Sequence, residues 1–140
     1  MGLILGSDHA GFDLKERIKK YLEEAKIEYK DIGCFSENRC DYPDYARLVA
    51  GSISKGEYEM GVLICGTGIG MSICANRFPK IRAALCRDIN DAEMSRRHNN
   101  SNILVLGGRK TPHDLALIIL KTWLSTDFEG GRYHQRLDKI

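Results

Sequence analysis

The chain has 140 residues, 43% hydrophobic and 29% charged, so we expect one globular domain covering residues 1–140. Its 21 basic and 19 acidic residues are spread along the sequence and sum to +2, which excludes a broad basic surface for nucleic acid. No apolar run reaches the roughly 20 residues that cross a bilayer, and residues 1–7 lack signal-peptide features, so we expect a cytoplasmic protein without membrane partners.

Short apolar runs alternate with amphipathic stretches, a pattern typical of strands separated by helices. The first helix is predicted from Leu14, Ile18 and Leu22, which recur every four residues. The glycine-bearing segments 107–109 and 130–136 are expected to be irregular. In chain order we predict a strand at 2–6, the first helix, a strand at 27–32, a helix at 42–54, a strand at 60–65, a helix from about 71, a strand at 82–86, a helix at 91–97, a strand at 102–106 and a helix at 112–125.

Because this alternation needs crossover connections, we predict an α/β fold, a Rossmann-like three-layer α-β-α sandwich with a five-stranded, mainly parallel sheet. In such sheets ligands bind beyond the carboxyl ends of the strands, near a topological switch point. Functional residues are therefore expected at the strand ends. Four segments qualify: 8–9, 65–70, 98–99 and 107–109.

The five cysteines form neither C-x-x-C pairs nor a zinc-binding pattern, and their number is odd. We therefore expect no disulfide framework and no metal site. Most of the thiols are expected to be buried in the core. The cysteines are Cys34, Cys40, Cys65, Cys74 and Cys86.

The clearest local signal is a buried strand that ends at Cys65 and is followed by a loop with three glycines. Such a loop lets backbone N–H groups converge on an anion, and the helix that follows adds its positive end. That field would favour a thiolate base or nucleophile at Cys65. The alternative is a core cysteine before a tight turn. The glycine spacing is not that of a dinucleotide-binding loop, and no P-loop lysine is present.

Two histidine-containing pairs also lie at element ends. Asp8 and His9 follow the first strand, although an Asp at that position is equally typical of a helix cap. His98 and Asn99 end the fourth helix, where a histidine often only complements the helix dipole. Each pair is weak evidence by itself.

Three arginines stand beside glycines, which suits a phosphate because guanidinium binds it in a bidentate manner and glycine lets the backbone approach. The alternative for each arginine is a solvated surface side chain. They are Arg109, Arg132 and Arg136.

Together, five motifs resemble the type B ribose-5-phosphate isomerase family, in its order and spacing over nearly the whole chain. The resemblance implies reversible interconversion of ribose 5-phosphate and ribulose 5-phosphate, a step of the pentose phosphate pathway, through an enediol and without metal or organic cofactor. It also implies a homodimer with active sites at the subunit interface, and leaves open whether dimers pair into tetramers. The motifs are residues 6–12 (GSDHAGF), 41–43 (DYP), 65–70 (CGTGIG), 95–99 (SRRHN) and 130–132 (GGR).

The resemblance also implies roles for individual residues. Cys65 would move the proton between C1 and C2, and the loop backbone would stabilise the enediolate oxygen. His98 would protonate the ring oxygen to open the furanose, with Thr67 assisting. Asp8 and Asn99 would hold hydroxyls or relay protons. The loop comprises Gly66, Thr67, Gly68, Ile69 and Gly70, Tyr42 would line the pocket, and the phosphate would be held by His9, Arg109, Arg132 and Arg136, with the subunit that supplies Arg109 left open.

Two details refine this picture. Relatives that lack the cysteine use a glutamate on the following helix, but here Ala75 and Asn76 offer no carboxylate, so the cysteine mechanism is implied. Relatives commonly have histidine after the Gly-Gly-Arg motif, whereas this chain has Tyr133, with His134 one place later, and we assign neither a catalytic role. The alternatives are an isomerase of six-carbon phosphosugars, such as allose 6-phosphate or galactose 6-phosphate, and a non-catalytic phosphosugar-binding module.

Overall fold

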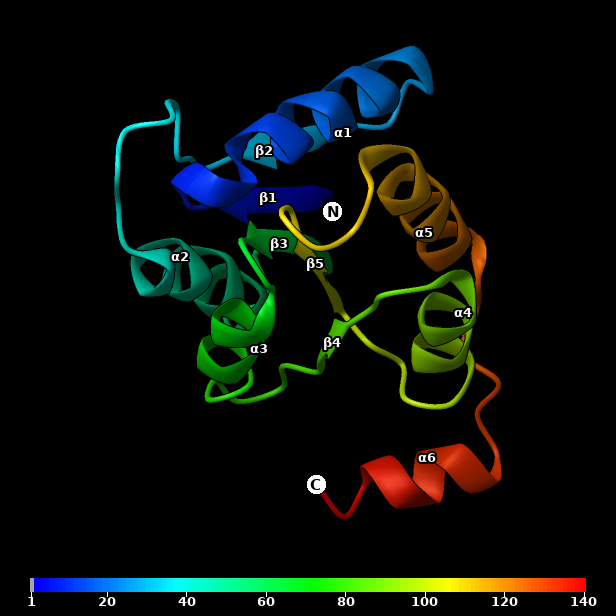
Figure 1. The fold of residues 1–140 in the computed structure, drawn as a ribbon. Helices are drawn as coiled ribbons and strands as arrows, with labels where there is room; N and C mark the ends of the chain where they lie inside the picture. Colours follow the sequence, from blue (N-terminus) through cyan, green and yellow to red (C-terminus); the bar gives the residue numbers. More distant parts are fainter. Residues whose placement is uncertain (1) are drawn as a thin grey trace.

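The computed structural model describes residues 2–140 and has a five-stranded sheet in the order β2-β1-β3-β5-β4 between two layers of helices (Figure 1). Every pair of neighbouring strands is parallel, which confirms the Rossmann-like sandwich and extends "mainly parallel" to the whole sheet. The strands are β1 (Leu3–Ser7), β2 (Tyr29–Asp31), β3 (Met60–Cys65), β4 (Ala83–Leu85) and β5 (Ile103–Gly107).

Helices cover both faces of the sheet because its central strands are apolar on both sides. Along β3, Val62 and Ile64 pack under α1, α4 and α5, whereas Leu63 and Cys65 pack under α2 and α3. The 3-10 helix η1 precedes α1, and α6 lies outside both layers with none of its residues buried. The helices are η1 (His9–Gly11), α1 (Phe12–Glu24), α2 (Tyr42–Ser54), α3 (Ile69–Ala75), α4 (Ile89–Arg97), α5 (His113–Ser125) and α6 (Arg132–Leu137).

The predicted bounds of β3 and α2 are confirmed, and the other elements differ by a few residues. The edge strands β2 and β4 are shorter than predicted because each pairs with its one neighbour over only three residues. Helix α3 begins earlier than predicted, directly after Gly68, whose positive φ of 82° turns the chain into the helix. Helix α4 also begins earlier, because the Asp88 side chain accepts the N–H of Asp91 and caps it.

The expectation of an irregular segment at 130–136 is wrong beyond its first two residues. Gly130 and Gly131 have positive φ values of 71° and 57° and redirect the chain, and α6 then begins at Arg132. The two glycines mark only the turn before the helix.

The cysteines are all free, as expected, and Cys34, Cys65 and Cys86 are buried. Cys40 and Cys74 are half-buried. Within residues 2–140, no helix is both long enough and apolar enough to cross a membrane.

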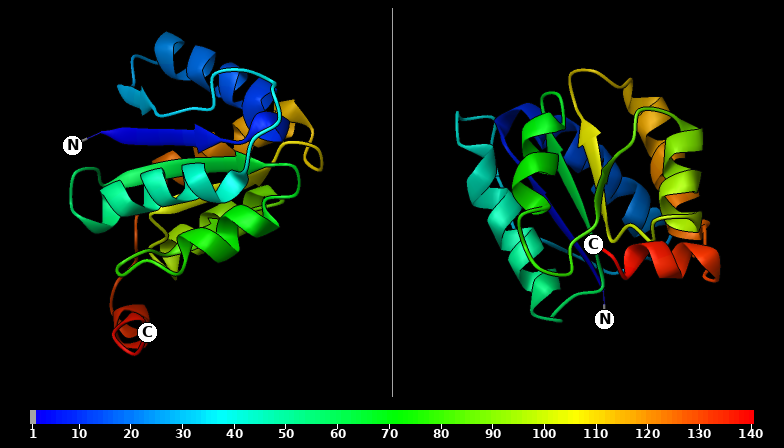
Figure 2. Two further views of the ribbon diagram at one scale, coloured as in Figure 1. Left: turned by 90° about the vertical axis from the view of Figure 1, so that its left-hand side faces the viewer. Right: turned by 90° about the horizontal axis from the view of Figure 1, so that it is seen from below.

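All strands run in one direction, so the sheet has two chemically different edges (Figure 2, left). The loops after β1, β3 and β5 gather at what we call the carboxyl edge. The chain enters the strands at the opposite amino edge, toward which α6 lies. Strands β1 and β3 are neighbours whose onward connections lead to opposite sides of the sheet, and their carboxyl ends therefore form the topological switch point.

Candidate active site

At the switch point, the chain segments that follow β1 and β3 are held against each other by backbone contacts. The Asp8 N–H donates to the Ile64 carbonyl at 3.2 Å. A Cβ on Gly11 would lie 2.5 Å from that same carbonyl oxygen, so only glycine permits this approach. The Asp8 carboxylate accepts the N–H groups of Ala10 and Gly11 at 3.0 and 3.1 Å. The capping interpretation of Asp8 is therefore confirmed.

The Cys65 sulfur is buried at the end of β3, with 5% of the residue exposed, and accepts the Gly68 N–H at 3.2 Å. This bond gives the sulfur a backbone donor, which is the kind of partner that a negatively charged sulfur needs. Gly68 has a φ of 82°, and a Cβ there would lie 2.5 Å from the Leu85 side chain. The loop geometry thus requires glycine at this position.

The loop that follows β5 is hydrogen-bonded to the other side of the loop that follows Cys65 (the Cys65 loop). The Gly108 N–H donates to the Cys65 carbonyl at 2.8 Å, and the Arg109 N–H donates to the Gly66 carbonyl at 3.0 Å. The Arg109 side chain is exposed and passes Gly66, where a Cβ would lie 3.8 Å from its Cδ. Exposed Thr67 accepts the Ile69 N–H at 3.2 Å through its hydroxyl. Arg109 and Thr67 therefore lie beside the buried thiol at the carboxyl edge.

The segment that leads into α2 reaches the same edge through two contacts. His9 Nδ1 accepts the Cys40 N–H at 3.2 Å, so its proton is on Nε2 when the ring is neutral. The Tyr42 ring covers Gly70, where a Cβ would lie 2.5 Å from the ring's Cζ. One chain thus gathers at its carboxyl edge Asp8, His9, Tyr42, Cys65, Gly66, Thr67, Gly68, Ile69, Gly70 and Arg109.

His98 and Asn99 are not at this edge, and their expected position beside the strand ends is wrong. They end α4, which runs antiparallel to the strands and returns the chain to the amino edge before β5. Strand β5 lies between them and the carboxyl edge, and its four steps from Ile103 to Gly107 span about 13 Å at the usual rise per strand residue. Gly107 pairs with Cys65. A residue only a few positions before a parallel strand lies at the amino edge, where that strand begins.

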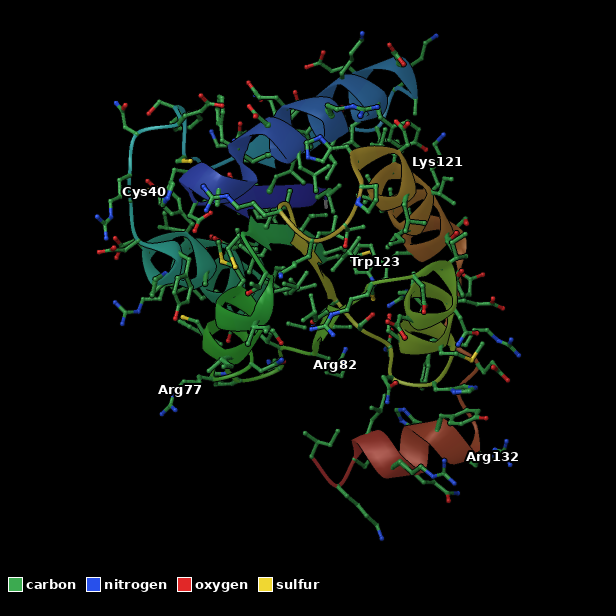
Figure 3. The ribbon with its side chains drawn as sticks, viewed as in Figure 1. Cys40, Arg77, Arg82, Lys121, Trp123 and Arg132 are labelled. Carbon is green, nitrogen blue, oxygen red and sulfur yellow. The ribbon has the colours of Figure 1, made fainter. Side chains whose placement is uncertain are left out.

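His98 instead lies next to the C-terminal segment. Its ring stacks on Tyr133 with a centroid separation of 4.2 Å and an interplanar angle of 16°. Its Nε2 is 3.6 Å from Glu129 Oε2. Arg132 and Arg136 extend from α6 on the same side of the molecule (Figure 3 labels Arg132), and both are exposed. The hydrogen bond to the Tyr133 hydroxyl raises the pKa of Arg132 above its ordinary value.

The chain matches a family of known proteins over nearly its whole length. A family model described as Ribose/Galactose Isomerase matches residues 3–140. The chain belongs to this family. It is 45% identical to ribose-5-phosphate isomerase B of Escherichia coli K12 over 138 residues, which cover 99% of this chain and 93% of that protein.

Solved structures of the ribose/galactose isomerase family share the fold over the whole chain. A ribose 5-phosphate isomerase from Thermotoga maritima is 51% identical, with a TM-score of 0.96, 99% of this chain covered and 95% of that chain. Ribose-5-phosphate isomerase B from Mycoplasma genitalium with bound ribulose-5-phosphate is 36% identical, with a TM-score of 0.95 and coverages of 99% and 93%. The chain is therefore an isomerase of carbohydrate metabolism.

Two basic residues at the carboxyl edge of this isomerase were not predicted from the sequence. Arg87 follows β4 and Lys110 follows Arg109, and both line a hollow of about 400 Å³ at the carboxyl edge together with Thr67 and Ile69. The signal was available, because the predicted strand at 82–86 ends directly before Arg87. The Tyr133 contact with His98 had no such signal, because it depends on where α6 docks.

Proposed function

We propose that this chain interconverts ribose 5-phosphate and ribulose 5-phosphate in the cytoplasm by proton transfer through an enediolate, without metal or organic cofactor. The observation that carries the proposal is the buried Cys65 sulfur at the switch point, with the Gly68 N–H directed at it. The names of the Escherichia coli and Thermotoga maritima relatives, and the ribulose-5-phosphate bound to the Mycoplasma genitalium relative, support the five-carbon substrate.

In this mechanism Cys65 removes the proton from C2 of the open-chain aldose, and the electron pair moves through the new C1–C2 double bond onto the C1 oxygen. Backbone N–H groups of residues 66–70 donate to that oxygen, a contribution typically worth about 10²–10³ in rate for each donor. Cys65 then returns the proton to C1, while the proton of the C2 hydroxyl passes to the C1 oxygen, so that C2 becomes the carbonyl and C1 carries the hydroxyl. Asp8 holds the sugar hydroxyls close to the loop.

The cyclic substrate must first open, because a furanose has no free carbonyl. His98 donates a proton to the ring oxygen as the bond between C1 and that oxygen breaks, and the C1 hydroxyl, with Thr67 assisting, releases its proton to water and becomes the carbonyl. Asn99 holds a neighbouring hydroxyl. The phosphate at C5 is bound by His9, Arg109, Arg132 and Arg136.

Because His98 and Cys65 lie at opposite edges of one chain, these steps need a second copy of the chain. We infer a homodimer in which the His98 region of one protomer completes the Cys65 site of the other. An apolar surface next to the loop supports this: Tyr42 is 38% exposed, Ile69 48% and Ile73 64%. Such exposed apolar residues are typical of an interface.

A mixing experiment tests the shared site. Cys65→Ala and His98→Gln homodimers should each be inactive. After dissociation and reassociation at equal amounts, about half of the dimers are mixed, and each mixed dimer has one site with both residues intact. Recovery of about a quarter of wild-type activity is therefore expected, and no recovery in verified mixed dimers would contradict the shared site.

A substrate panel tests the reaction itself. The family description includes galactose, which favours the six-carbon isomerase as the second candidate. Purified protein should turn over ribose 5-phosphate with a higher kcat/KM than allose 6-phosphate or galactose 6-phosphate. The reverse order would support the six-carbon alternative. Phosphosugar binding without turnover would support a binding module.

A further inference from the structure

The aromatic ring of Tyr133 contacts three of the residues assigned above to the substrate. One contact is the parallel stack on the His98 imidazole. The others are the guanidinium groups of Arg132 and Arg136, at 4.9 and 5.6 Å from the ring centroid. The Tyr133 hydroxyl also accepts a hydrogen bond from Arg132 Nη2 at 2.8 Å. Among residues 2–140, no other aromatic ring stacks on His98 or lies under the Arg132 or Arg136 guanidinium group.

The other contacts of His98 hold its backbone and the Nε2 edge of its ring, whereas Tyr133 contacts the face of the ring. The His98 N–H donates to the Met94 carbonyl at the end of α4, which holds the backbone. Glu129 faces Nε2, and its own carboxylate accepts Arg97 Nε at 2.8 Å. The Glu129 N–H donates to the Arg97 carbonyl at 3.0 Å. The facing charged groups are therefore Glu129 and Arg97, and Tyr133 supplies the stacking surface.

The substrate requires the proton donor and the phosphate-binding groups to lie at a fixed separation. In ribofuranose 5-phosphate only C4, C5 and O5 separate the ring oxygen from phosphorus. The group that protonates the ring oxygen and the groups that bind the phosphate must therefore keep a short and constant separation. Arg132 and Arg136 are long, exposed side chains, and each loses rotamer freedom when a ring holds it.

We propose that Tyr133 is a positioning residue that sets the His98 imidazole and the Arg132 and Arg136 guanidinium groups in one array, so that ring opening and phosphate binding occur on the same bound sugar. The inference rests on the proposed function, because it uses the roles given there to the three side chains. Tyr133 itself donates no proton to the sugar in this scheme.

The test compares Tyr133→Ala, Tyr133→Phe and Phe128→Ala in the full-length protein. Phe128 is the matched control. It is another aromatic residue that contacts α6, with its ring 6.3 Å from that of His134, and its ring does not stack on His98. Three quantities are measured: kcat with ribose 5-phosphate, the inhibition constant of inorganic phosphate, and the NMR shift of the His98 ring proton, which the ring current of Tyr133 displaces.

Tyr133→Ala should lower kcat and raise the phosphate inhibition constant, each by about 2- to 12-fold, the range that one aromatic contact usually provides. It should also move the His98 signal. Tyr133→Phe keeps the ring and should restore kcat and the His98 signal, with only the phosphate constant partly raised. Phe128→Ala should leave all three close to wild type.

Two results would overturn the inference. One is a Tyr133→Ala enzyme with wild-type kcat and phosphate inhibition. The other is equal losses in Phe128→Ala, which would reduce Tyr133 to a packing residue of the C-terminal segment. Failure of the proposed function is a separate result: wild-type protein would then not turn over ribose 5-phosphate, while the NMR shift would still report the stack.

Discussion

The Cys65 loop and the His98 region are built by different forces. The loop is held by buried backbone hydrogen bonds and by glycines in contacts that a Cβ would block. The His98 region is held by partly exposed side chains, such as the Arg97–Glu129 ion pair, in which both are 40% exposed. A single chain can thus complete the first region, whereas the second remains accessible to a partner. Four predictions would break or sharpen this contrast.

The largest effect is expected from Cys65→Ala. Loss of the proposed base should lower kcat with ribose 5-phosphate by about 10²–10⁴-fold, the usual contribution of acid–base catalysis. Inhibition by inorganic phosphate should not change, because the arginines remain. Cys74→Ala is the control, since this half-buried thiol lies on α3 outside the site and its removal should leave turnover unchanged. Wild-type turnover in Cys65→Ala would contradict the proposed base.

Gly56 and Gly68 have the same φ of 82°. Their alanine variants therefore distinguish the cost of backbone strain from the cost of a steric clash in the loop after Cys65. Gly56→Ala has nothing within 4 Å and should lower the free energy of unfolding by about 1 kcal/mol through strain, without loss of activity. Gly68→Ala adds the clash with Leu85 and should cost about 2–4 kcal/mol and most of the turnover. Urea denaturation and kcat measure both. Equal changes in unfolding free energy and in kcat for the two variants would mean that the loop after Cys65 is not tightly packed.

Cys86 directly follows β4 and shows what burial does to a thiol. Burial is the main cause that raises the pKa of Cys86 from 9.0 to about 11, the carboxylates of Asp91 and Asp88 add to the rise, and the hydrogen bond with the Ser95 hydroxyl opposes it. The raised pKa means that the folded state keeps the proton more tightly, so this contribution to stability is fully present below pH 9 and is lost as the pH rises to about 11.

The expected loss of unfolding free energy over this interval is about 2 kcal/mol. Cys86→Ala should remove that part of the pH dependence, as measured by urea denaturation at pH 8 to 11. Cys74→Ala should retain it. The same slope in all three proteins would assign the loss to other groups.

The smallest effect on stability is expected from Glu129→Gln. Partly exposed ion pairs usually contribute less than about 1 kcal/mol, so the free energy of unfolding should change by no more than that, and less at high salt. Turnover of ribose 5-phosphate should nevertheless fall, because the carboxylate no longer holds the edge of His98. A large loss of stability would show that this region is as firmly built as the Cys65 loop.

Periodicity predicted the elements well where one strand or helix contributes its own signal. Strand β3 and helix α2 were predicted with their observed bounds. The prediction failed for α6, because Gly130 and Gly131 suggested a loop and no apolar stripe marked the six-residue helix that follows. Short helices without a buried face have little periodicity to detect.

The position of His98 shows the same limit for the site. Sequence motifs identify it together with Cys65, but the direction of α4 puts the two at opposite edges. Spacing along the chain does not show at which edge of a sheet a helix ends. That position follows only when it is known which two strands the helix connects. The rule for strand ends applied to Asp8, Cys65 and Arg109, which follow strands, and not to His98, which precedes one.

The sequence by itself determined the parallel α/β fold and the glycine loop after Cys65, because alternating apolar runs and glycines act locally. Only the tertiary structure decided which residues meet. Sheet order brings Asp8 to Cys65, and the antiparallel return of α4 takes His98 away from them to the ring of Tyr133. Contacts between residues distant in sequence depend on strand order and helix direction, which no local pattern encodes.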